Sequence, residues 1–337
     1  MRALIVFLVL VLTAAAGRYG LEELKKPPRA ENGPIEIRIR PLVLDSSNPE
    51  RTQLGELHFL GAWQLIGQER SFGGLSSLNI LPDGRVRALN DTATMFTFPQ
   101  PGSAGAGPET GIVKRMPTMR RRNGPWKPAS TDSESMALDP DSGLVWAGFE
   151  MTQMVCRYSP DLAKAQACRT WPEMKHWTET SSIESLARLA DGRFIIIAEG
   201  AHGYREGRDV LLFAGDPAAD DTKSPMLMQY LPPVGYDPTD AVEIGDGKLL
   251  VLNRRATIYQ GFTGVITLVD ISHMKPGATL PSREIARFVP PVLSDNFEGL
   301  ALERGPDGER FLWVVSDDNH LFFQRTLLLK FALPDHF

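Results

Sequence analysis

The chain has 337 residues, of which 42% are hydrophobic, so it is long enough for one large domain or two ordinary ones. Its 36 basic and 41 acidic residues leave a net charge of -5. This balance argues against nucleic-acid binding, because a phosphate backbone requires a basic surface. A small anionic ligand remains compatible with the sequence if basic residues gather locally.

The N-terminus predicts a signal peptide over residues 1–16. One positive charge, an apolar core and the small residues Ala14-Ala15-Ala16 fit a secretory signal and its cleavage site. The apolar core is short for a membrane span, and an uncleaved anchor is the alternative. Residues 17–34 are expected to form a linker and residues 35–337 a single domain. The mature chain, without another apolar span, is expected to be a periplasmic or secreted monomer.

A hairpin pattern recurs along the rest of the chain. Each copy has a short apolar strand, a turn that usually contains Asp-Gly, and a second apolar strand. Asp-Gly between apolar runs indicates a hairpin, because it tolerates the positive φ of a tight turn. The copies cover residues 76–91, 134–150, 184–199, 240–253 and 298–317. Their spacing of roughly 50 to 58 residues is typical of a propeller.

Two more strands are expected after each of the first four hairpins, which predicts an all-β propeller of five four-stranded blades. The last unit lacks a fourth strand, and the unassigned segment 56–66 is expected to supply it and close the ring. Segment 35–44 either widens that sheet or belongs to a sixth blade. A β-sandwich is the alternative fold, but it does not explain the long-period alignment. The expected additional strands are 95–98, 112–116, 154–158, 165–171, 210–213, 226–231, 265–270 and 284–289.

The two cysteines, Cys156 and Cys168, lie in strand-like segments on either side of a polar turn near Leu162. This arrangement places their sulfurs opposite each other and predicts a cross-strand disulfide. A zinc site would need further ligands at the usual spacing, and the sequence offers none.

Polar residues recur at the two ends of the hairpins that should share one face of a propeller. Buried together without a counter-ion, such acids would cost several kcal/mol each or become protonated. Oxygen ligands favour calcium over zinc or copper. An acid at these positions can instead cap backbone amides of the neighbouring blade. The first strands begin at Ser76, Glu134, Glu184, Asp240 and Glu298, and the second strands end at Asp91, Glu150, Glu199, Asn253 and Asp317. The predicted metal ligands are Glu134, Glu184, Asp240, Glu298 and Asp317.

Loops expected on the same face are basic. Arginine's planar fork suits phosphate oxygens, so a rim of basic residues around a metal would favour a phosphate or another anionic group. Each single basic residue can also be ordinary solvated surface. The sequence contains no P-loop, H-E-x-x-H or G-x-S-x-G motif. The predicted substrate-binding residues are Arg120, Arg121, Arg122, Lys127, Arg254 and His320.

Three groups of residues resemble a known family: Ser71–Leu78 with Pro82–Arg85, Glu184–Leu186, and Asn296–Leu302 with Val315–Asn319. Over about residues 55–335 the chain resembles the family called esterase-like activity of phytase, whose members are exported bacterial β-propeller proteins. The resemblance implies a phosphoesterase or a related ester-hydrolysing activity. The D-A-A-D-D-P-A calcium run of β-propeller phytases is absent, which argues against phytate itself as the substrate.

The sequence therefore supports the hypothesis of a calcium-dependent hydrolase of phosphate esters or similar anionic esters. Glu298, Asp317 and Glu184 are its predicted catalytic carboxylates; one of them or a metal-activated water would supply the nucleophile, with calcium as Lewis acid and template. The main alternative is a non-catalytic periplasmic scaffold or ligand-binding propeller, in which the cation only clamps the blades. A calcium-propeller lactonase is a third hypothesis.

Overall fold

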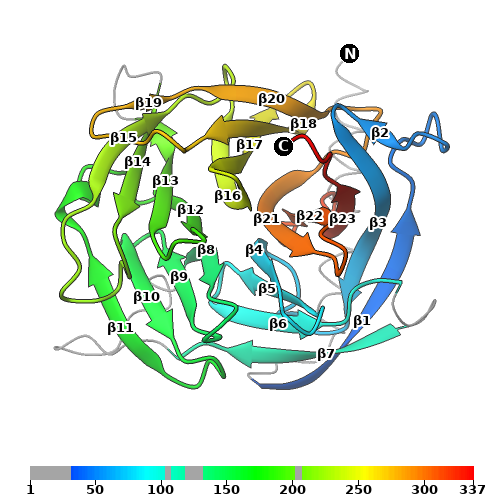
Figure 1. Cartoon of the computed structure of the whole chain (residues 1–337). Helices are drawn as coiled ribbons and strands as arrows, with labels where there is room; N and C mark the ends of the chain where they lie inside the picture. The colour runs from blue at the N-terminus through cyan, green and yellow to red at the C-terminus, as the bar shows by residue number, and fades with distance from the viewer. Residues whose placement is uncertain (1–31, 103–107, 118–131, 202–206) are drawn as a thin grey trace, which may run out of the picture.

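The computed structural model describes residues 32–102, 108–117, 132–201 and 207–337. In these residues the regular structure is β-strand apart from the short 3₁₀ helix η2, Pro172–Met174. The strands surround a central axis, with β4, β8, β12, β16 and β21 nearest to it (Figure 1). The chain is thus a propeller-like all-β protein. The expected signal peptide and residues Arg120, Arg121, Arg122 and Lys127 lie outside the described residues.

Strand pairing organises the sheets into five series of four antiparallel strands, each beginning near the axis. The first is β4 (Leu75–Ile80), β5 (Val86–Asn90), β6 (Thr94–Phe98) and β7 (Pro108–Arg115); the second is β8 (Ser133–Leu138), β9 (Val145–Phe149), β10 (Met154–Tyr158) and β11 (Ala165–Thr170). The third is β12 (Ile183–Arg188), β13 (Phe194–Ala201), β14 (Arg208–Phe213) and β15 (Met226–Tyr230); the fourth is β16 (Asp237–Gly245), β17 (Lys248–Thr257), β18 (Gly261–Asp270) and β20 (Ser282–Phe288). The fifth is β21 (Asn296–Arg304), β22 (Arg310–Asp317), β23 (Leu327–Ala332) and β3 (Leu57–Gly67).

The N-terminal strands close the ring. β3 pairs with β23, as predicted for segment 56–66, and supplies the fourth strand of the last series. β1 (Asn32–Leu42) begins three residues before the expected domain start and pairs with both β3 and β7. It therefore joins the first and fifth series into one ten-stranded sheet, in place of the separate sheets expected for individual blades. Pairing on both sides leaves neither outer strand with an open edge there.

Three short features complete the topology. β19 (Thr279–Leu280) adds a parallel strand to the edge of the third series at β15, and β2 (Gln53–Leu54) pairs with β3. The expected disulfide is confirmed: Cys156 on β10 and Cys168 on β11 are direct cross-strand partners and form a bond. A disulfide is consistent with an extracytoplasmic protein.

Apolar side chains fill the spaces between neighbouring series. Trp313 of β22 is fully buried beside Leu78 of β4, which links the fifth series to the first. Close packing also depends on glycine: a Cβ at Gly299 of β21 would lie 2.9 Å from side-chain atoms of Leu78 and Val315. Such a contact is shorter than packed carbon atoms allow, so the inner strands can approach only because this position has no side chain. Within the described residues no helix has the length and apolarity needed to cross a membrane.

Candidate metal centre

The first two strands of every series share a register irregularity near the residue where the first strand begins. In each pair one residue of the first strand has no cross-strand partner. An extra residue of this kind is a β-bulge, which turns its side chain away from the regular alternation of the strand. The residues left unpaired by the irregularity are Ser76, Glu134, Glu184, Thr239 and Glu298.

The fourth series differs from the sequence alignment by one residue. Thr239, and not Asp240, occupies the position equivalent to Glu134 and Glu184. One carboxylate oxygen of Asp240 accepts a hydrogen bond from the backbone N–H of Ala241, and the other accepts one from Leu300, both at 2.8 Å. Asp240 therefore ties β16 to β21, which is the capping role that remained open as an alternative for these acids.

The same one-residue offset changes which residue is equivalent at the end of the second strand. On each second strand, one residue pairs with the first-strand residue just before the bulge. The next residue along that second strand is arginine in the fourth series and acidic in the other four. These equivalent residues are Asp91, Glu150, Glu199, Arg254 and Asp317. Arg254 thus stands where the other series place a carboxylate, and Asn253, named from the sequence, lies one residue earlier.

Arg254 is held by acids of two other series. Its Nη2 donates to Oε1 of Glu199 at 2.6 Å, and its Nη1 donates to Glu298 and, at 2.8 Å, to Oδ1 of Asn296. Burial alone would lower the pKa of Arg254, but the charges of Glu298 and Glu199 outweigh it and raise that pKa. The guanidinium is therefore a fixed positive charge beside the carboxylates of Glu199 and Glu298.

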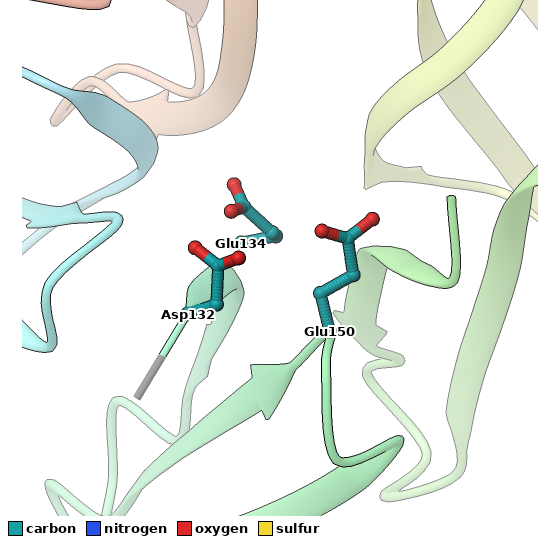
Figure 2. Close-up of side chains that lie close together, drawn as sticks. All are labelled: Asp132, Glu134 and Glu150. Carbon is teal, nitrogen blue, oxygen red and sulfur yellow. The ribbon is translucent and has the colours of Figure 1, made fainter. Parts of the chain in front are cut away.

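Five carboxylates form what we call the acidic cluster: Asp132, Glu134, Glu150, Glu184 and Glu199. Asp132, Glu134 and Glu150 each place an oxygen within 4.8 Å of the others, and the same holds for Glu150, Glu184 and Glu199. Figure 2 shows the carboxyl groups of Asp132, Glu134 and Glu150 turned toward a common space. Glu150 belongs to both groups and so connects the second series to the third.

Burial and mutual repulsion govern the charge of this cluster. Burial raises the pKa of Glu184 well above its ordinary range, and the neighbouring Glu199 and Glu134 raise it further. Burial, followed by Asp132 and Glu150, does the same to the pKa of Glu134. Burial also raises the pKa of Glu150 to about 7, although a hydrogen bond with Glu184 opposes the shift. Without a cation, the cluster therefore holds protons near neutral pH.

Glu298 interacts both with Arg254 and with the carboxylates of the acidic cluster. Only 6% of the residue is exposed, and its Oε2 has no hydrogen-bond partner among the described residues. Burial raises its pKa to about 7, against the attraction of Arg254. A buried carboxylate oxygen without a partner costs about 1–3 kcal/mol or more. This orphaned oxygen and the oxygen-rich cluster fit a hard cation such as calcium, which binds carboxylates in flexible arrangements.

Asp317 lies on the first-series side of Glu298. Burial and the charge of Glu298 raise the pKa of Asp317 well above its ordinary range. Its neighbour Asp318 accepts a hydrogen bond from the backbone N–H of Gly74 at 3.0 Å. Gly73 and Gly74 both have positive φ, and a Cβ at Gly73 would lie 2.7 Å from Asp318. The Gly-Gly motif near the start of the chain therefore fits against the Asp-Asp motif near its end.

The structure brings together four of the five predicted ligands. Glu184 interacts electrostatically with Glu134 and Glu298, and Glu298 with Asp317, whereas Asp240 is engaged by backbone amides. His320 is exposed beside Gly74 at the rim, and its backbone N–H donates to Asp318. Asp132 was not predicted as a site residue; the strand register gives it one acidic equivalent, Asp237 of the fourth series. Glu150 and Glu199 were recognised as converging but not chosen as ligands.

The metal-free protein is expected to lose stability as pH rises from about 5 to 8. The pKa values of Glu150 and Glu298 are raised from 4.5 to about 7, so their stabilising contribution is complete below pH 4.5 and is lost as pH rises through 7. Thermal unfolding in chelator across this range should show a melting temperature that falls by roughly 5 °C or more. In the Glu150→Gln variant, the melting temperature should fall less over the same pH range. A melting temperature that rises over the interval would contradict the described environment of these acids.

The fold and the site together define a propeller-like all-β protein whose inner strands converge on buried and partly buried carboxylates. The chain belongs to the phytase-like family described as esterase-like activity of phytase, whose sequence profile matches residues 70–320. This match confirms the resemblance seen in the motifs. It includes both partners of the Gly-Gly and Asp-Asp contact, and all acids of the metal centre.

Solved structures with a similar chain course are distant in sequence. The Cps50 (Swd1) β-propeller domain of Myceliophteria thermophila is 6% identical, with 86% of this chain and 98% of that chain covered and a TM-score of 0.41. A chain of a nidogen/laminin complex is 9% identical (88% and 96% covered, TM-score 0.40). A calcium structure of the Trichoderma reesei carbohydrate-active enzyme family AA12 is 10% identical (83% and 98% covered, TM-score 0.39). No curated protein matches the chain significantly by sequence.

Proposed function

We propose that this protein is an exported, calcium-dependent hydrolase of phosphate esters or related anionic esters, in which each of the five series is one blade of a propeller. Family membership supports an ester-hydrolysing activity. The disulfide supports export to the periplasm or the medium, where thiols oxidise and calcium is available.

The observation that carries the proposal is that only some of the converging carboxylates have a positively charged partner. Arg254 pairs with Glu199 and Glu298. In the described part of the chain, no arginine, lysine or histidine forms an ion pair with Glu134, Glu150 or Glu184. Carboxylates that converge in a buried space without a counter-charge are costly unless a cation binds them. Asp132, Glu134, Glu150 and Glu184 are therefore the proposed ligands, with Glu298 at the boundary; Asp240 is left out because its two oxygens are already occupied.

Bound calcium would act as Lewis acid and template for the ester. The chain's own carboxylates Glu298, Asp317 and Glu184 are proposed to orient water and accept its proton as the water attacks phosphorus. The ester P–O bond then breaks, and the alcohol leaves with a proton. Asp317 and Glu298 suit this role because their charges interact and neither belongs to the two close groups of carboxylates that include Glu150.

The anion is proposed to be held by the basic segment that leads into the metal centre. Arg120, Arg121, Arg122 and Lys127 precede Asp132 by 5 to 12 residues, and Asp132 is part of the acidic cluster. His320, exposed at the rim, is a further proposed contact. Arg254 is less suited to the anion than the sequence indicated, because carboxylates and an amide already occupy its guanidinium.

A structural cation in a non-catalytic propeller is the second candidate. It is favoured by the origin of the acids: Asp132, Glu134 and Glu150 belong to the second series, whereas Glu184 and Glu199 belong to the third. A cation between them would clamp two neighbouring series. This alternative predicts a large calcium-dependent rise in melting temperature without turnover of any ester.

Chelation is expected to lower phosphate-ester hydrolysis at least 100-fold, and calcium is expected to restore it, because the ion would supply several kcal/mol of charge stabilisation. The purified mature protein would be analysed for bound metal and assayed with a panel of phosphate esters and lactones, with and without chelator. The assay temperature must lie well below the melting temperature of the chelated protein, which separates loss of chemistry from unfolding. Hydrolysis that persists in chelator would exclude the calcium mechanism, and turnover of lactones alone would favour a lactonase.

A further inference from the structure

A groove of about 670 Å³ lies on the face where the acids converge. Its walls come from the hairpin between β17 and β18, the segment before β21 and the loop between β22 and β23. The larger apolar residues of the lining are Ile258, Phe262, Pro290 and Phe323. Its polar residues include Asp295, Gln324 and Arg325.

The groove lies close to the metal centre along two short pieces of chain. β17 leads from Arg254, which binds Glu298, to Thr257 in the groove wall. On the other side, Asp295 lines the groove and directly precedes Asn296, which accepts a hydrogen bond from Arg254. The groove wall therefore begins within three residues of Glu298 and of its partner Arg254.

The walls expose large apolar side chains to solvent. Ile258 is 99% exposed, Tyr259 beside it is 98% exposed, and Phe323 on the opposite loop is 63% exposed. The β17–β18 pairing continues to Thr257 and Gly261, so a regular hairpin carries Ile258 and Tyr259 out beyond the ring. Apolar residues gathered beside a polar site mark a binding surface more often than scattered ones do.

One residue of the lining, Gln324, has a buried side-chain donor without a partner among the described residues. Gln324 is only 8% exposed, its Oε1 accepts a hydrogen bond from Asn319, and its Nε2 has no partner among the described residues. Arg325 adds a positive charge, partly balanced by Asp295 at 3.6 Å. Apolar walls with a few polar groups are the usual composition of a site for a small organic ligand, and the volume lies in the usual range.

We propose that this groove binds the apolar aryl or alkyl group of the ester whose anionic head lies at the metal centre. The inference rests on the proposed function and narrows it: the substrate is an amphiphilic phosphate ester, with one charged end and one apolar end. A compound that carries phosphates all round its ring would leave the apolar walls exposed. Arg325, which lines the groove, would bind an acceptor oxygen near the junction of the two parts.

The test compares two ligands that share a head and differ in apolar area, phenyl phosphate and 2-naphthyl phosphate. Binding to the full-length mature protein with calcium is measured by calorimetry, and hydrolysis is measured in parallel. The second ring adds apolar area to be buried, so wild type is expected to bind 2-naphthyl phosphate roughly tenfold more tightly. The double variant Ile258→Ser and Phe323→Ser should reduce this preference to about twofold or less. Both side chains are exposed, so folding should be unaffected.

Leu227→Ser is the matched control, because Leu227 is an apolar residue that is 52% exposed on β15, outside the groove. It should retain the wild-type preference. A wild type without preference, or a double variant that keeps it, would overturn the groove assignment even if both esters are hydrolysed. Preferential binding that depends on Ile258 and Phe323 but comes with no hydrolysis would leave the groove assignment standing and reject the proposed hydrolase. Failure of both ligands to bind would reject both.

Discussion

Glu184→Gln is expected to weaken calcium binding at least 100-fold and to abolish calcium-dependent hydrolysis. Glu184 is buried, lies within ligand distance of Glu150 and Glu199, and interacts with the charges of Glu134 and Glu298. A neutral amide keeps the shape of the side chain but removes one of the charges that attract the cation. Calorimetric titration of the chelator-stripped protein with calcium would measure the change.

The same substitution is expected to raise the melting temperature of the metal-free protein at pH 8. One of several repelling carboxylates is gone, so less free energy is needed to bury the others in their ionised form. Glu243→Gln is a suitable control, because Glu243 lies toward the opposite end of β16 and accepts a hydrogen bond from the backbone N–H of Ala190. Unchanged calcium affinity in Glu184→Gln, or an equal loss in the control, would remove Glu184 from the ligand set.

Arg254→Gln should have the largest effect on stability. The substitution leaves Glu199 and Glu298 without their guanidinium, and breaking a buried ion pair by removal of one partner costs about 3–5 kcal/mol. Because the Arg254 side chain is 23% exposed, the lower end of this range, roughly 3 kcal/mol, is expected. The melting temperature of the metal-free protein should fall by about 6 °C or more, as measured by calorimetry.

Calcium should restore more of this loss in Arg254→Gln than it adds to wild type, because the unpaired Glu199 and Glu298 become additional ligands. Native mass spectrometry would then detect one more calcium ion in the variant. Arg254→Lys is the matched control: it keeps the charge but loses the planar fork, so it should fall between the two proteins in stability without binding the extra ion. If Arg254→Gln had wild-type stability in chelator, Arg254 would not be stabilising the charges of Glu199 and Glu298.

The repeated hairpins were predictable because their signals are local. Asp-Gly turns and runs of apolar residues place β4 and β5, and the same signals place β21 and β22. Strand β3 was found by elimination, since the last unit lacked one strand. Strand β1 was recognised as extended, and one of its two alternatives, that it widens the sheet closed by β3, is confirmed. Its pairing with β7 was not predicted, because the alternation of Ile35 and Ile37 indicates a buried face and not which strands lie beside it.

The site was predicted less accurately because its geometry depends on single-residue bulges. In the fourth series Thr239 and Asp240 are adjacent polar residues, and so are Asn253 and Arg254. Alignment by chemical type selects Asp240 and Asn253, whereas the strand register selects Thr239 and Arg254. A bulge changes which residue faces the axis without changing the hydrophobic pattern, so nothing in the sequence alone distinguishes these assignments.

The partnership of β3 and β23 has a consequence for how the chain is made. Residues 57–67 leave the ribosome early, but their hydrogen-bonding partners at 327–332 are synthesised more than two hundred residues later. Contacts so distant in sequence form slowly, and the waiting strand is an unpaired edge in the meantime. One edge of β3 in the nascent protein therefore stays without its partner until residues 327–332 have been made, and these residues then close the ring.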